Sequence, residues 1–73
     1  MEHQILLDSF EKVQEFVKIT NKKDFDVDLL SGKYLVNAKS IMGVFSLDLT
    51  HPLTVVYEKE DPRFIKEIEK FFA

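Results

Sequence analysis

The sequence predicts an α+β fold, an open-faced sandwich in which helices cover one face of a four-stranded antiparallel sheet. Short alternating or β-branched apolar runs mark the strands, and other stretches carry apolar residues at helical spacing. Taken along the chain they give the order βαββαβα. Only two Gly and two Pro occur in 73 residues, so the connections must be short. This order favours one layer of helices on one sheet, in a single domain spanning residues 1–73.

The chain begins with a predicted strand and a predicted helix. The strand closes at Ile5-Leu6-Leu7. Asp8 is the expected N-cap of the helix, because Glu11 follows three residues later as in a capping box. The helix is predicted over Ser9–Thr20, where these residues recur at helical spacing: Phe10, Val13, Phe16, Val17 and Thr20.

A hairpin is predicted after the polar stop at residues 21–24. Phe25, Val27 and Leu29 alternate with other residues, which is the period of a strand with one buried face. Ser31-Gly32 is the turn signal, and Tyr34–Val36 is the returning strand.

The alternation also predicts that three carboxylates share one face of the first hairpin strand. A calcium site would need more oxygen ligands from a loop, so the solvated face of a sheet explains these residues more simply, and we predict no metal site. The three carboxylates are those of Asp24, Asp26 and Asp28.

Ser40 is the predicted N-cap of a short helix of two turns. This helix carries more apolar residues than one core-facing stripe can use: Ile41, Met42, Val44, Phe45, Leu47 and Leu49. We expect Met42 and Phe45 to be at least partly exposed, and Val44 and Leu47 to belong to the core. Exposed apolar residues in one place are typical of a partner site.

The last part of the chain predicts a turn, a strand and a helix. His51-Pro52 is the turn and Leu53–Tyr57 is a β-branched strand. Asp61-Pro62 opens the helix, with Pro at its preferred first position. Its apolar stripe consists of Phe64, Ile65, Ile68, Phe71 and Phe72.

Composition narrows the possible functions. Without Cys, disulfides, thiol catalysis and Cys-based zinc sites are excluded, and a net charge of −3 argues against a nucleic-acid binder. No signal-peptide pattern and no apolar stretch of membrane-spanning length is found, so we expect a cytoplasmic protein that binds no membrane. His3 and His51 lie far apart without partners for a metal or a catalytic set, and we predict neither an enzyme nor a cofactor.

The segment Val36–Leu49 resembles the regulatory-serine segment of HPr, the small phosphocarrier of the sugar phosphotransferase system. Lys39-Ser40-Ile41-Met42-Gly43 stands as it does in Gram-positive HPr proteins, and Phe45 replaces an apolar residue typical of that helix. Phe16-Val17 and Asp26-Val27 also resemble the family. The resemblance implies an HPr-like domain over the whole chain. It also implies that Ser40 matches the serine modified by HPr kinase/phosphorylase.

The sequence departs from the HPr pattern at the start of the first helix. HPr carries a phosphorylated histidine there, followed closely by Arg-Pro, and here the shortened loop has none of the three. Ser9 lies nearest the missing histidine and Glu11 nearest the missing arginine. Asp8 and Glu11 add negative charge where a phosphate would sit, which opposes its binding. A phosphoserine at Ser9 would be a low-energy ester, unable to pass its phosphate to a sugar transporter.

The resemblance therefore implies a non-catalytic, HPr-like regulatory protein, similar to the catabolite-repression HPr homologue that also lacks the histidine. The expected binding residues are Lys39, Ser40, Ile41, Met42 and Phe45. Implied partners are HPr kinase/phosphorylase or a catabolite-control regulator. We expect a monomer or a weak, strand-exchanged homodimer, because the shortened first loop could act as a hinge. Two alternatives remain open, a true HPr phosphocarrier and a generic small α+β interaction domain.

Overall fold

The computed structural model describes all residues from Met1 to Ala73 and confirms the predicted order of elements. The strands pair in the order β1-β4-β2-β3, and every pair is antiparallel. The elements are β1 (Glu2–Ile5), α1 (Phe10–Asn21), β2 (Asp28–Ser31), β3 (Tyr34–Asn37), α2 (Ile41–Phe45), β4 (Leu53–Val56), α3 (Pro62–Ile68) and the 3₁₀ turn η1 (Glu69–Phe71).

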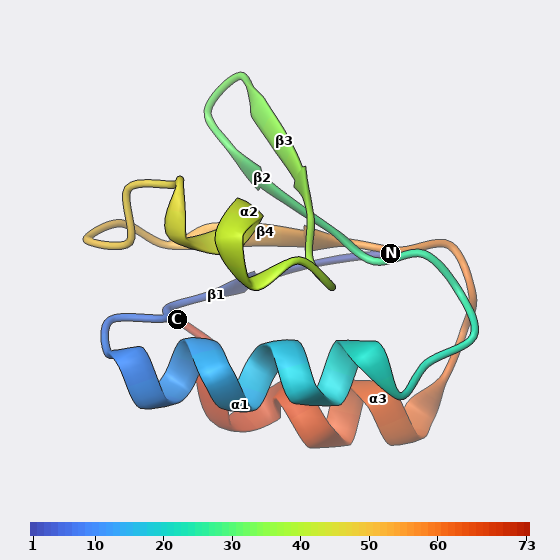
Figure 1. Cartoon of the computed structure of the whole chain (residues 1–73). Coiled ribbons are helices and arrows are strands. Elements are labelled where there is room, and N and C mark those ends of the chain that lie inside the picture. The colour runs from blue at the N-terminus through green and yellow to red at the C-terminus, as the bar shows by residue number, and fades with distance from the viewer.

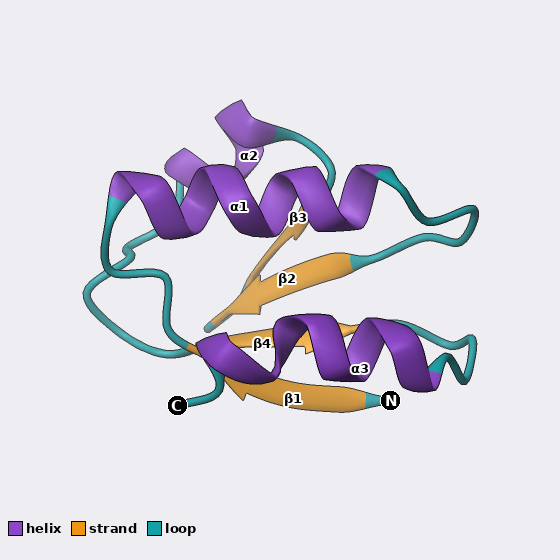
Figure 2. Cartoon of the chain, turned by 90° about the horizontal axis from the view of Figure 1, so that it is seen from below, coloured by secondary structure: helices purple, strands orange, loops and turns teal.

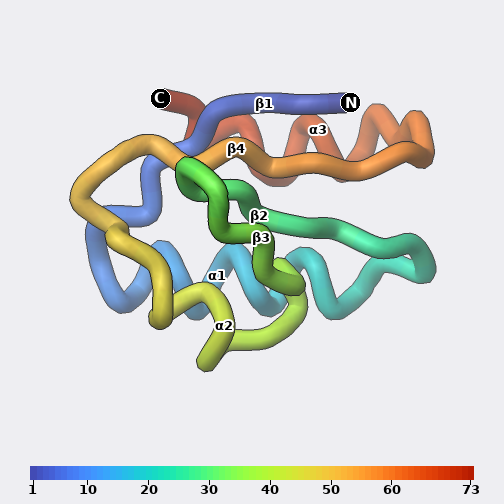
Figure 3. Tube along the Cα trace, turned by 90° about the horizontal axis from the view of Figure 1, so that it is seen from above, coloured from blue at the N-terminus to red at the C-terminus, as the bar shows by residue number.

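Helices α1 and α3 lie side by side along one face of the sheet, and the opposite face of the sheet carries no helix (Figures 1 and 2). The short helix α2 packs beside α1 and next to β3, at the edge of the sheet (Figure 3). No helix combines the length and the apolar character that crossing a membrane would require.

The core lies between the sheet and the two long helices and consists of 17 buried apolar residues. Its largest members are aromatic. The ring of Tyr57 meets that of Phe64 edge-on at 5.0 Å between centroids, and Phe16 meets Phe71 in the same way at 5.9 Å. Such edge-to-face pairs stabilise a small core beyond the area that they bury.

The two edges of the sheet differ. Along β1, the C-terminal residues form a further bridge, in which the Ala73 N–H donates to the Gln4 carbonyl at 3.0 Å. The Leu6 N–H donates to the Phe71 carbonyl at 2.8 Å. At the opposite edge, β3 pairs only with β2. The chain thus covers part of one edge of its sheet with its own backbone and leaves the other edge open.

The structure corrects the predicted start of the first helix. Ser9, not Asp8, is the N-cap of α1: its backbone is extended, and its Oγ accepts a hydrogen bond from the Lys12 N–H at 3.2 Å. Asp8 instead pairs with the Lys12 ammonium at 2.8 Å. Phe10 is thus the first helical residue and is 55% exposed, so its helical spacing does not place it in the core.

The hairpin prediction was right in kind and wrong in its limits. β2 begins at Asp28, so residues 25–27 are not part of it and Asp24 and Asp26 do not share its face. Val27 is nevertheless buried, and its carbonyl accepts from the Ala38 N–H at 2.8 Å in the approach to the strand. The chain turns at Gly32-Lys33, where Gly32 has φ +59°, and β3 extends to Asn37.

Four other expectations, three on element limits and one on the core stripe, were wrong. β1 ends at Ile5, so Leu7 reaches the core from a loop. α2 contains five residues rather than two full turns, and Leu49 lies outside it. β4 stops at Val56, one residue before the buried Tyr57. Phe72 follows the last helical turn and is 40% exposed, so it does not belong to the core stripe.

Candidate functional site

Ser40 caps α2 as the sequence predicts. Its backbone is extended and its Oγ accepts a hydrogen bond from the Gly43 N–H at 3.1 Å. A Cβ on Gly43 would lie 3.3 Å from that hydroxyl oxygen, so the glycine leaves room for the close approach of the cap. The Ser40 side chain is on the surface, where a modifying enzyme could reach it.

The end of α1 positions the segment that leads into Ser40. The buried Thr20 hydroxyl lies 2.9 Å from the Ala38 carbonyl and 3.0 Å from the Val17 carbonyl. The Asn21 amide donates to the Lys39 carbonyl at 3.0 Å. Thr20 recurs in the sequence at the same helical spacing as the apolar residues, and that spacing does not reveal this role. The one sequence feature that could have indicated this role is a threonine in an otherwise apolar helical stripe.

Lys39 does not point toward the Ser40 hydroxyl. Its Nζ donates to the carbonyl of Lys23 at 2.9 Å, in the connection between α1 and β2. The Lys23 ammonium in turn pairs with Glu67 of α3 at 2.7 Å. The two lysines therefore tie the segment before α2 to the far end of α1 and to α3.

Three apolar side chains of α2, the helix that Ser40 caps, are exposed. Met42 is 77% exposed, and Ile41 and Phe45 are each more than a third exposed. Val44 and Leu47 are buried, so the expected division between exposed and core residues is confirmed. Phe10, from the start of α1, stacks on Phe45 with 5.5 Å between ring centroids.

We call Phe10, Ser40, Ile41, Met42 and Phe45 the Ser40 surface. Phe10 was not among the predicted binding residues, because its contact with Phe45 joins residues far apart in the chain. Beside this aromatic pair lies a shallow hollow of about 240 Å³, lined also by Leu7, Asp8, Ser9, Leu49 and Thr50. The start of α1 and the α2 helix thus form one continuous surface.

The start of α1 presents carboxylates and a capping hydroxyl. The Ser9 hydroxyl is engaged by the Lys12 N–H. Hydrogen bonding and charge from the Lys12 ammonium hold the pKa of Asp8 below its usual range, so Asp8 is ionised at neutral pH. Glu11 in the first turn is exposed. Lys12 offsets one of the two carboxylates, and the net negative charge that is left disfavours an anion here.

Neither histidine belongs to this surface. His3 is in the edge strand β1, as expected, but it is partly buried: its Nε2 lies 2.9 Å from the Tyr57 hydroxyl and its ring stacks on Phe72 at 5.1 Å. His51 is exposed in the turn after α2, with its Nε2 3.5 Å from an Asp48 carboxylate oxygen. No group of three His, Asp or Glu side chains is placed so that it could hold a metal ion.

No protein-family profile matches the chain, and no curated protein matches it. Solved structures do. The chain is similar to HPr-C-His from Thermoanaerobacter tengcongensis, with a TM-score of 0.80, 23% identity and coverage of 96% of this chain and 88% of that one. It is also similar to the phosphocarrier protein HPr from Bacillus anthracis str. Ames, with a TM-score of 0.73, 23% identity and coverage of 100% and 94%.

At this level of identity the likeness shows the fold. The chain has the HPr-like open-faced sandwich, which confirms the fold class that the sequence predicts.

Proposed function

We propose that this protein is a non-catalytic, HPr-like regulatory protein of the phosphotransferase system, which binds partner proteins through the Ser40 surface and carries no phosphohistidine. The observation that carries the proposal is a contrast between two neighbouring parts of the molecule. The helix α2 exposes Ile41, Met42 and Phe45 around an accessible Ser40. The adjoining start of α1 has no histidine, and a serine cap stands there instead.

The negative charge at the start of α1 supports the proposed loss of the phosphate relay. A phosphoryl group on a side chain at the start of α1 would lie near Asp8 and Glu11. Lys12 offsets their negative charge only in part, so the remaining charge raises the free energy of the phosphorylated form. The Ser9 hydroxyl already accepts a backbone hydrogen bond as the helix cap. We therefore assign Ser9 a structural role only, at the position of the lost histidine.

Phosphorylation of Ser40 is the proposed regulatory step. A phosphate would add up to about two negative charges beside three exposed apolar side chains, which changes the partners that the surface accepts. For Lys39 to reach that phosphate, its ammonium must leave the Lys23 carbonyl. The proposed modifying partner is HPr kinase/phosphorylase, and the proposed binding partner is a catabolite-control regulator in the cytoplasm.

The binding proposal is tested by capture from an extract of a Gram-positive bacterium. The immobilised protein is used with and without prior treatment with HPr kinase and ATP, and bound regulator is measured by immunoblot against the catabolite-control protein. We expect capture to depend on Ser40 phosphate and to be lost in Met42→Ala. Lys66→Ala on α3 is the matched exposed control and should change nothing. Equal capture by the parent and by both variants would refute the proposal.

A true phosphocarrier is the second candidate, favoured by the structural likeness to a phosphocarrier HPr. It requires phosphate on a histidine. Incubation with enzyme I and phosphoenolpyruvate should therefore give acid-labile phosphate on His3 or His51 if this candidate is right, and none if our proposal is right. A generic α+β interaction domain, the third candidate, would accept phosphate from neither donor.

A further inference from the structure

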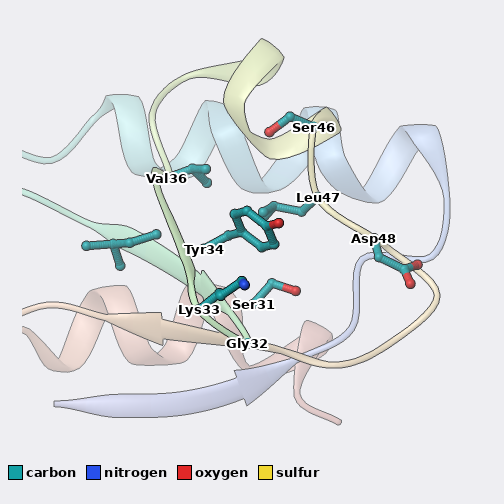
Figure 4. Close-up of a pocket in the computed structure, with 9 residues that line it drawn as sticks. Ser31, Gly32, Lys33, Tyr34, Val36, Ser46, Leu47 and Asp48 are labelled. Carbon is teal, nitrogen blue, oxygen red and sulfur yellow. The ribbon is translucent and has the colours of Figure 1, made fainter.

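We propose that the free edge of β3 binds an extended peptide segment of another protein by strand addition, at a site separate from the Ser40 surface. The edge lies beside a hollow of about 740 Å³, a size typical of ligand pockets. The hollow is bounded by the hairpin on one side and by the segment after α2 on the other (Figure 4). Its lining consists of residues 31–36 and 46–48.

The hydrogen-bond pattern identifies which backbone groups are free. In the register of β2 and β3, Leu29 faces Val36 and Leu30 faces Leu35. The Ala38 N–H donates to the Val27 carbonyl, and hydrogen-bonded pairs alternate along an antiparallel ladder. The N–H and C=O groups of Val36 therefore point to β2, whereas those of Leu35 point to the open edge.

The side chains at this edge lack the features that usually prevent pairing. Edge strands are normally blunted by charged residues, proline or a covering segment. The opposite edge strand, β1, carries Glu2 and Gln4 and is partly covered by Phe72-Ala73. The first two residues of β3, Tyr34 and Leu35, are 64% and 61% exposed, and the strand contains no charged residue and no proline.

The shape of the hollow favours a single extended chain over a second copy of this domain. Ser46, Leu47 and Asp48 line the side of the hollow that lies across from β3 (Figure 4). A peptide strand can lie between the two walls, but the hairpin of a second copy would bring a second strand against the segment 46–48. Tyr34 and the buried Leu47 give the hollow an apolar centre, so the peptide should alternate apolar and polar residues.

The test is a titration of the ¹⁵N-labelled full chain with the acetylated, amidated peptide Lys-Val-Thr-Val-Thr-Val-Lys. We expect saturable amide shifts limited to residues 31–36 and 46–48, with slower exchange of the Leu35 N–H. The same peptide N-methylated at every residue, which leaves no residue with an N–H to donate on either edge, should produce no such shifts. Equal shifts with both peptides, or none with either, would overturn the proposal. If the same residues shift when only the protein concentration is raised, the edge binds a second copy of this chain, and the peptide proposal is overturned.

Leu35→Pro is the decisive variant. Because the Leu35 N–H takes no part in pairing with β2, proline removes a donor from the edge without breaking the hairpin. Leu35→Ala, which keeps the N–H, is the matched control for loss of the side chain. We expect Leu35→Pro to weaken peptide binding about tenfold relative to Leu35→Ala. Equal affinities of the two variants, with the amide spectrum showing both folded, would contradict strand addition.

Discussion

The Thr20 hydroxyl shows how one buried polar atom can position a distant surface. It lies between the carbonyls of Val17, in its own helix, and Ala38, just before the Ser40 surface. A hydroxyl has one proton to donate, so these two acceptors share it. Ala38 is fully buried, and its carbonyl depends on this contact rather than on water.

Replacing Thr20 by Val should lower the free energy of unfolding by about 1–3 kcal/mol, because a buried carbonyl then loses its donor while the side-chain volume is kept. Urea unfolding followed by circular dichroism measures the loss. Thr20→Ser, which retains the hydroxyl, should lose less of this stability. A Thr20→Val protein as stable as the parent would show that the hydroxyl is not needed to hold the segment before α2.

Met42 and Val44 provide a comparison of two apolar residues in the same short helix. Met42→Ala should change the free energy of unfolding by less than about 0.5 kcal/mol, because the side chain is largely in water. Val44→Ala removes two methyl groups from the core and should cost about 1.5–3 kcal/mol. The same urea experiment measures both. A large loss in Met42→Ala would mean that Met42 supports the fold and is not available to a partner.

At the scale of the elements, Asp61 makes the stability that the start of α3 contributes depend on pH. Its carboxylate accepts hydrogen bonds from the N–H groups of Phe64 and Arg63, at 3.1 and 3.0 Å. The bond from Phe64 is the main cause that lowers the pKa of Asp61, and the bond from Arg63 and the charges of Lys23 and Lys59 add to it. Since the pKa is lower in the folded state, the ionised group stabilises the fold above its unfolded pKa. That stabilisation is lost as pH falls through the folded pKa.

Asp61→Asn should flatten the acid side of the stability profile, because asparagine caps the helix without titrating. Melting temperatures measured between about pH 5 and pH 2 should fall less steeply in this variant than in the parent. Asp61→Ala separates the two effects, since it loses the cap and should melt lower even at neutral pH. Parallel acid limbs for the parent and Asp61→Asn would refute the role of this carboxylate.

Local signals explain which element limits were predictable. Ser40 and Asp61 are caps because each side chain bonds to N–H groups two or three residues ahead, a contact that the sequence itself contains. At the start of α1, Asp8 and Ser9 are both good caps, and sequence alone does not choose between them. In the structure Ser9 is the cap, and the buried Leu7 lies two residues before it in the loop that enters the helix.

Most features of the site that could not be predicted from the sequence are contacts between distant segments. The stacking of Phe10 on Phe45 and the bond from Lys39 to the Lys23 carbonyl depend on how α1 and α2 pack. The exposure of Met42 was predictable, because the helix has too many apolar residues for one buried face. The free edge of β3 follows from the strand order, which periodicity does not determine.

At the scale of the whole molecule, stability rests on a small aromatic core. A chain of 73 residues should have a free energy of unfolding of about 4–11 kcal/mol. Phe64 is fully buried and meets both Tyr57 and Phe25. One such side chain therefore contributes a large share of the total free energy of unfolding.

Phe64→Ala should cost about 3–5 kcal/mol and leave much of the protein close to its unfolding midpoint. Phe10→Ala is the matched control, since its ring is more than half exposed and should cost under about 1.5 kcal/mol through loss of the stack on Phe45. Thermal unfolding followed by near-ultraviolet circular dichroism compares the two. Similar losses in both variants would contradict the division into core and surface.

We propose that the HPr-like fold here retains a regulatory serine and has lost the phosphate relay. It is tested most directly by mass spectrometry of the intact protein, with site mapping, after exposure to each phosphate donor. HPr kinase with ATP should place one phosphate on Ser40, and enzyme I with phosphoenolpyruvate should add none. Phosphate on His3 or His51 from enzyme I, with none on Ser40 from the kinase, would contradict this proposal.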